Sequence, residues 1–276
     1  NIEFFIMNTI PIISSSNTPN PQTELINKYS SKDNILLRTI TKHTTEYIPV
    51  MHITIFDLLN SFNRLSKNRG YIKPTYEILE KERPVKPYLD LEYYCKLGSS
   101  EYPDIEAIKE KSEFLKMNII LDIQKYFHSN GYEIKEADIK IVESLDELKK
   151  EKDLYKISKH VVVNHYVDIE KIDTINSTID DTFISRSLGK IPTIVCFQNT
   201  KQAKALPDFI DGPCYYDEIM KQSCLDRKVY NLNQQFRLPL SIKSESDRRY
   251  LKNDELTYSQ AKGTKLEKNK IVLQYL

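Results

Sequence analysis

Two acidic side chains, two residues apart, are the most chemically suggestive feature of the sequence. Asp90 and Glu92 lie in the run Lys86-Pro-Tyr-Leu-Asp-Leu-Glu-Tyr-Tyr94, whose β-compatible composition favours a strand. Side chains alternate between the faces of a strand, so both acids would lie on one face and the apolar residues between them on the other. Two carboxylates held in this way suit a hard divalent cation with oxygen ligands.

A second strand is predicted from 156 to 165, and it carries donors for anionic oxygen. Lys156, Ser158 and His160 share one parity, while Ile157 and the valines at 161 and 163 take the other. The apolar face would pack inward and hold the polar face at a fixed pitch.

A third segment adds one more carboxylate and one guanidinium. Leu225-Asp226 is followed by Val229-Tyr230 and then by Asn233-Gln-Gln-Phe-Arg237. Each of these pieces is weak by itself, because short motifs recur by chance.

Taken in order, the DxE pair, the KxSxH strand and the LD…VYxxNxxFR segment resemble the three motifs of the archaeo-eukaryotic primase superfamily, most closely its PrimPol-like branch. The lead-in Tyr76-Glu77-Ile78 resembles the segment before the first motif of that family. The run Arg237-Leu-Pro-Leu-Ser-Ile-Lys243 resembles the basic run after its third motif. The resemblance covers residues 70 to 245.

The resemblance implies an α+β, or mixed α/β, fold. Its catalytic sheet would be similar to an RNA-recognition motif, and a smaller, mostly helical amino-terminal lobe would accompany it. It also implies a two-metal site for Mg²⁺ or Mn²⁺, whose catalytic ligands would be Asp90, Glu92 and Asp226. The residues implied to bind the incoming nucleotide are Lys156, Ser158, His160, Asn233, Arg237 and Lys243. Many relatives have Asp where this chain has Glu92, and the longer ligand is expected to favour manganese.

The function implied is template-directed DNA or RNA synthesis, by nucleotidyl transfer from a nucleoside triphosphate to a 3′ hydroxyl, in replication or damage tolerance. The residues do not separate primer synthesis from primer extension. The partners implied are a DNA template-primer and (d)NTP, and by analogy a replicative helicase and a single-strand-binding protein.

Two other functions stay open on the sequence alone. A non-catalytic module could hold single-stranded nucleic acid on the same sheet through its 18 Tyr and 10 Phe residues and basic side chains. A metal-dependent nuclease also uses a DxE pair with a distant Asp. Retention of all three acids argues against the first, and the Ser158, His160 and Arg237 set argues against the second, because a nuclease needs no triphosphate cradle.

Each residue also has a plain structural interpretation. Paired acids on a strand are usually its solvated face, and a histidine beside a valine run, such as His160 or His165, is usually structural. Asp226 alone would be a cap or turn acid. The order of the three motifs is what favours a functional interpretation.

Composition is that of an ordinary globular protein of 276 residues. No apolar run approaches a membrane span, so no membrane partner is expected. The four cysteines form no CxxC pair, so we expect no zinc site, reduced and buried thiols, and an intracellular, reducing compartment. The abundance of Lys, Asn, Ile and Tyr hints at an AT-rich genome such as that of a virus or plasmid.

Charge is uneven along the chain, although the formal net charge is only +1. Residues 227 to 276 carry eleven Lys or Arg against five Asp or Glu. Such a segment can neutralise phosphate, or it can be a solvated charged tail.

Four regions are expected: a flexible segment at 1–23, an amino-terminal lobe at 24–83, the catalytic lobe at 84–250 and a basic segment at 251–276. Helical spacing is present at 24–30 and 55–67. A long helix is predicted from Asp104 to Asn130, closed by Gly131. A strand is predicted from 137 to 143 and a second long helix from 167 to 188.

Overall fold

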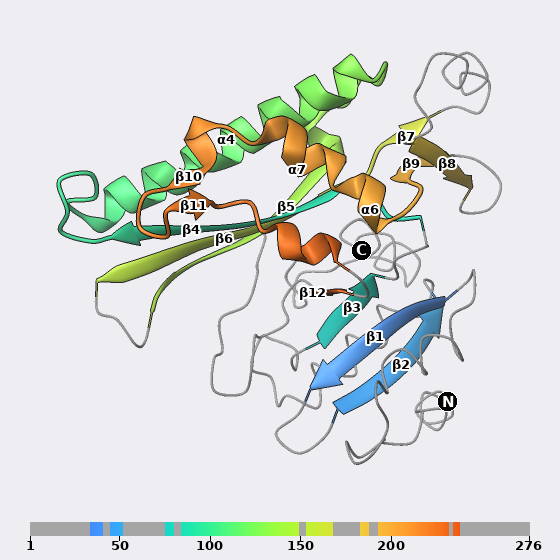
Figure 1. Cartoon of the computed structure of the whole chain (residues 1–276), viewed down its shortest axis with the longest axis horizontal. Helices are drawn as coiled ribbons and strands as arrows, with labels where there is room; N and C mark the ends of the chain where they lie inside the picture. Colours follow the sequence, from blue (N-terminus) through green and yellow to red (C-terminus); the bar gives the residue numbers. More distant parts are fainter. Residues whose placement is uncertain are drawn as a thin grey trace, which may run out of the picture. The chain divides into compact units, whose positions relative to one another are not determined.

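The computed structural model describes residues 34–40, 45–51, 75–79, 84–148, 153–167, 183–187, 193–231 and 234–237 (Figure 1). The chain divides into two compact units. One contains residues 1–80, 235–274 and 276, and the other contains residues 81–234 and 275. The fold is mixed α+β, with antiparallel sheets and few helices among the described residues.

The first unit contains a four-stranded sheet in the order β12-β3-β1-β2. Its strands are β1 (Asn34–Ile40), β2 (Thr45–Met51), β3 (Thr75–Leu79) and β12 (Gln234–Arg237). The lobe was predicted to be mostly helical, but its described elements are strands, because β-branched and aromatic residues favour pairing across β1, β2 and β3. The helical segments predicted at 24–30 and 55–67 lie outside the described residues.

The second unit contains a three-stranded antiparallel sheet in the order β4-β6-β5. Its strands are β4 (Tyr88–Lys96), β5 (Ile139–Glu147) and β6 (Leu154–Val163), and a short 3-10 turn, η2 (Glu136–Asp138), leads into β5. All three strands overlap the predicted ones, but β5 runs from 139 to 147 where 137–143 was predicted, and β6 ends at 163 where 165 was predicted. One face of the sheet is mostly apolar and packs beneath a long helix (Figure 1).

That helix is α4 (Ile105–Ser129), and it matches the predicted helix. The Asp104 carboxylate caps its amino end by accepting a hydrogen bond from the Ala107 N–H, at 2.9 Å. At the other end Gly131 has φ +81°, a conformation that glycine adopts without strain. The residues of α4 that are fully buried against the sheet are Ile108, Leu115, Ile119, Ile123 and Phe127.

The helix predicted from 167 to 188 is wrong in its described part. Phe183–Ser187 is a strand, β8, which pairs antiparallel with β9 (Thr193–Phe197), and β9 also pairs with β7 (Tyr166–Val167). Local helical spacing is outweighed by pairing with a β-branched partner strand, which the sequence window does not contain. Residues 168–182 lie outside the described residues.

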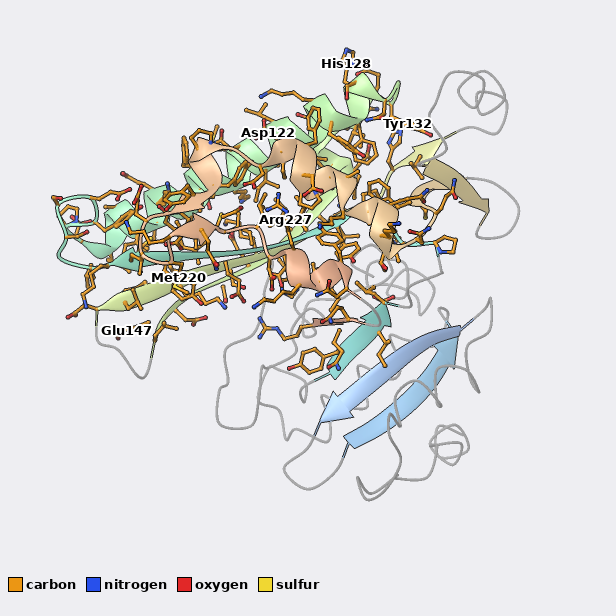
Figure 2. All side chains as sticks on the ribbon, in the orientation of Figure 1. Asp122, His128, Tyr132, Glu147, Met220 and Arg227 are labelled. Carbon is orange, nitrogen blue, oxygen red and sulfur yellow. The ribbon has the colours of Figure 1, made fainter. Side chains whose placement is uncertain are left out.

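The chain returns to the main sheet through short elements: α6 (Thr200–Ala203), α7 (Ala205–Ile210), η3 (Pro213–Tyr215), β10 (Tyr216–Asp217), β11 (Gln222–Ser223) and η4 (Arg227–Tyr230). The Tyr215 hydroxyl donates to Asp122 of α4, labelled in Figure 2, at 2.9 Å. Helix α7 lies on the same side of the sheet as α4 (Figure 1). This return segment therefore ends beside β4, where the third motif begins.

The cysteines are unpaired thiols, as expected, but only three of the four are buried. Cys95, Cys196 and Cys224 are buried, whereas Cys214 is half-buried in η3. In the described part of the chain, none of the helices has the length and apolar character needed to cross a membrane.

Candidate carboxylate site on the main sheet

The face of the main sheet turned away from α4 carries the predicted polar residues. Asp90 lies directly opposite His160 in the β4-β6 register, and Glu92 lies directly opposite Ser158. Their side chains share a face, because residues opposite each other in an antiparallel pair point the same way. The face is not simply solvated, since both Ser158 and His160 are buried. The first two motifs therefore meet on one surface.

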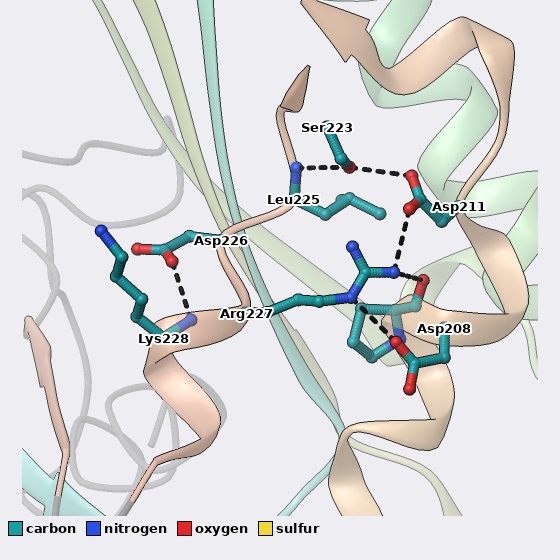
Figure 3. Close-up of polar contacts among 8 residues, drawn as sticks. Asp208, Asp211, Ser223, Leu225, Asp226, Arg227 and Lys228 are labelled. Atoms are coloured by element: carbon teal, nitrogen blue, oxygen red, sulfur yellow. Dashed lines mark hydrogen bonds and ion pairs between the residues drawn. The ribbon is translucent and has the colours of Figure 1, made fainter. Parts of the chain in front are cut away.

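The third motif joins the same sheet at the outer edge of β4. Leu225 forms a β-bridge with Leu91, the Glu92 N–H donates to the Cys224 carbonyl at 2.8 Å, and the Asp226 N–H donates to the Asp90 carbonyl at 2.8 Å. This register sets Asp226 opposite Asp90, and Figure 3 shows the Leu225 and Asp226 side chains pointing to opposite sides of the backbone. Because both leucines are buried on the α4 side, Asp226 belongs to the carboxylate face.

Asp226 also caps the amino end of η4, and the next residue, Arg227, holds η4 in place. Asp226 Oδ1 accepts from the Lys228 N–H at 2.8 Å. The Arg227 guanidinium donates to Asp208 Oδ1 at 2.8 Å and to Asp211 Oδ2 at 2.9 Å (Figure 3). This fork ties η4 to α7, so the position of the Asp226 backbone is fixed from both sides.

Two tyrosines fix the far end of η4 to the start of β4. The Tyr88 and Tyr230 rings stack with centroids 4.8 Å apart. The Tyr230 hydroxyl donates to the Tyr88 carbonyl at 2.5 Å, and the Tyr88 hydroxyl donates to the Val229 carbonyl at 3.0 Å. Burial raises the pKa of Tyr230 well above its usual value, so the hydroxyl stays a donor.

Tyr230→Phe should lower the free energy of unfolding by about 1 to 2 kcal/mol, because it leaves a buried carbonyl without its donor while the ring stacking stays. Urea denaturation measures this change. Tyr155→Phe is the matched control, since Tyr155 is half-buried at the end of β6. A loss no larger than that of the control would contradict the role given to the Tyr230 hydroxyl.

The two acids of β4 contact cationic or ionisable groups of β6. A Glu92 carboxylate oxygen forms an ion pair with the Lys156 ammonium. Asp90 Oδ1 lies 3.5 Å from His160 Nε2. The Glu92 side chain is 36% exposed, whereas that of Lys156 is nearly buried. The Lys156 ammonium therefore offsets one negative charge on this face.

The three predicted acids carry the kind of ligand that a hard divalent cation prefers, and their backbones lie side by side in one sheet. Asp90, Glu92 and Asp226 supply carboxylate oxygens from one face of one sheet. Within the residues that the structure describes, however, no three His, Cys, Asp or Glu side chains converge closely enough to hold an ion. Glu92 is turned to Lys156, with one of its two carboxylate oxygens in that ion pair.

Three predicted nucleotide ligands lie in the first unit or outside the described residues. Arg237 lies in β12, in the sheet of the first unit, and its side chain is half-buried there. Asn233 and Lys243 lie outside the described residues. His165, left as a structural histidine, has its Nδ1 2.9 Å from Asp138 Oδ2.

Sequence reasoning missed polar residues that β5 adds to the same face, among them Ser144 and Asp146. Ser144 lies opposite Ser158, and Asp146 lies opposite Lys156. The alternation of residues 139 to 147 carries this signal, but the predicted strand ended at 143 and left them out. Among the described residues, the face therefore contains four acids rather than three.

Comparison with known proteins adds no family. No protein-family model matches the chain, and no curated protein matches its sequence. The features that bear on function are therefore the three motifs and the register that brings parts of them together.

Proposed function

We propose that the chain is a template-directed nucleotidyltransferase, a primase-polymerase of the PrimPol-like type within the archaeo-eukaryotic primase superfamily. The observation that carries the proposal is the position of Asp226 opposite Asp90. The two residues come from motifs more than a hundred positions apart, and chance motifs would have no reason to share one face of one sheet.

The acidic side chains would bind metal ions, and the hydrogen-bond donors and cations would bind the triphosphate. Asp90, Glu92 and Asp226 would hold divalent ions, which when bound stabilise the attacking and leaving oxygens of an in-line displacement. Ser158 and His160 would donate hydrogen bonds to the triphosphate from the adjacent strand. Lys156 would offset its negative charge, and Arg237 is proposed for the same role as a bidentate donor.

A second candidate is a non-catalytic module that holds single-stranded nucleic acid. The ion pair of Glu92 with Lys156 favours it, because it neutralises one of the acids with a group of the protein itself. A sheet of this kind can hold bases by stacking without turnover.

A primer-extension assay separates these functions. The chain is incubated with a labelled primer on a DNA template, dNTPs and Mn²⁺, and a parallel reaction omits the primer and supplies NTPs as well. Lengthening of the primer supports the polymerase, and products without a primer add primase activity. Retarded but unchanged DNA in a gel shift would favour the binding module. Shortened primers would point to a nuclease and contradict the proposal.

The wider setting stays a proposal as well. A template-primer and (d)NTP are the partners that the site requires, and a replicative helicase and a single-strand-binding protein are proposed by analogy with the same superfamily. Coupled assays with such proteins become informative once extension is observed.

A further inference from the structure

Lys156 is a positive charge placed between two acids on the carboxylate face. Its ammonium pairs with Glu92 of β4, and its backbone lies directly opposite Asp146 of β5. Tyr94 lies opposite on the other side, with its ring centroid 5.7 Å from Lys156 Nζ. The lysine is 8% exposed, so its ammonium is largely shielded from water and contacts these few neighbours instead.

Asp146 is the acid that Lys156 does not use. Among the described residues, its Oδ2 is buried and has no hydrogen-bond partner. A buried carboxylate oxygen in this condition is unfavourable, and a donor that reached it would remove the penalty. A lysine directly opposite on the neighbouring strand is within reach, because such residues have Cβ atoms about 5 Å apart. One ammonium therefore has two acids available.

We propose that Lys156 exchanges between these acids when a divalent ion binds. Without the ion, the ammonium neutralises Glu92. When the ion is held by Asp90, Glu92 and Asp226, Glu92 gives up its lysine, and the ammonium pairs with Asp146 instead. This inference rests on the metal site of the proposed function and adds its regulation. Lys156 competes with the ion, and Asp146 is a positioning residue that acts through Lys156 without touching the ion.

Binding of Mn²⁺ alone, without DNA or nucleotide, tests the exchange. Free Mn²⁺ is followed by electron paramagnetic resonance in titrations of the wild type, Lys156→Met, Asp146→Asn and the double variant. We expect Lys156→Met to bind Mn²⁺ about tenfold more tightly, the scale of one hydrogen bond to a charged group. Asp146→Asn should weaken binding about threefold to tenfold in the wild-type background. It should have no effect beside Lys156→Met, because the lysine through which it acts is gone.

Each other outcome has a definite meaning. Equal affinity of the wild type and Lys156→Met would overturn the exchange and leave the proposed function standing. Weakening by Asp146→Asn in both backgrounds would make Asp146 a direct ligand and would also overturn it. Absence of Mn²⁺ binding in every variant would overturn both the exchange and the metal site. Lys156→Gln, a second neutral variant, repeats the test if Lys156→Met does not fold, and circular dichroism checks the fold of each.

Discussion

Asp90→Asn and Glu92→Gln should each reduce primer extension by about a thousandfold or more, equal to about 4 kcal/mol of activation free energy. Each change keeps the size of the side chain and removes one charge from the face that Asp226 shares. An amide is a poor ligand for a hard divalent ion. The rate of extension at saturating dNTP and Mn²⁺, measured in the linear phase, gives the effect.

Two controls separate this loss from misfolding. Glu147→Gln removes an exposed acid at the end of β5 and should leave extension unchanged. DNA binding by both site variants should stay close to that of the wild type, because phosphate affinity comes from basic side chains. Extension that persists in Asp90→Asn would refute the metal assignment, whereas equal loss in Glu147→Gln would show that the sheet tolerates no change of charge.

The faces of the strands were predictable, because side-chain alternation is a local property. Asp90 and Glu92 share a face whatever β4 pairs with, and so do Ser158 and His160. The contacts between the strands were not predictable. The register decides whether Glu92 meets Lys156, and it is set by where β4 and β6 come together, not by either sequence alone.

The position of Asp226 in the sheet was even less predictable from the sequence. Its own segment is too short to form a recognisable strand, and it joins the sheet through a single bridge beside Leu91. From the sequence, only the resemblance to a family predicted that Asp226 belongs to the site. The helix predicted from 167 to 188 is a strand at 183–187 for a related reason, because pairing with a distant strand outweighs local helical spacing.

Lys159 is a charged residue on the inward face of β6, where a lysine needs a partner. It takes the parity of Ile157 and Val161, on the face that packs beneath α4, and a buried lysine is rarely left unpaired. Its side chain is 0% exposed, forms an ion pair with Glu143 directly opposite on β5, and donates to Ser112 of α4 at 2.9 Å. These contacts lie behind Ser158 and His160 and tie the central strand to the helix.

Glu143→Gln should lower the free energy of unfolding by about 3 kcal/mol at pH 7, because it leaves a buried ammonium without its counter-ion. Lys159→Met should cost less, about 1 kcal/mol, because the Glu143 side chain is 34% exposed and can be hydrated when its partner is gone. Urea denaturation of both variants measures the difference. A Lys159→Met loss that equals or exceeds the Glu143→Gln loss would contradict the argument.

The loss in Glu143→Gln should also shrink as the pH rises. Burial lowers the pKa of Lys159, and Glu143 opposes that shift, so removing the acid lowers the lysine pKa further. Between that lowered pKa and the usual lysine value of about 10.4, the unfolded chain binds more protons than the folded chain, and stability therefore rises with pH. The Glu143→Gln deficit relative to the wild type should decrease between about pH 7 and about pH 10. The free energy of unfolding of Lys159→Met should lack this rise with pH, since its lysine is gone. A Glu143→Gln deficit that does not change with pH would show that Lys159 is not the group left unpaired.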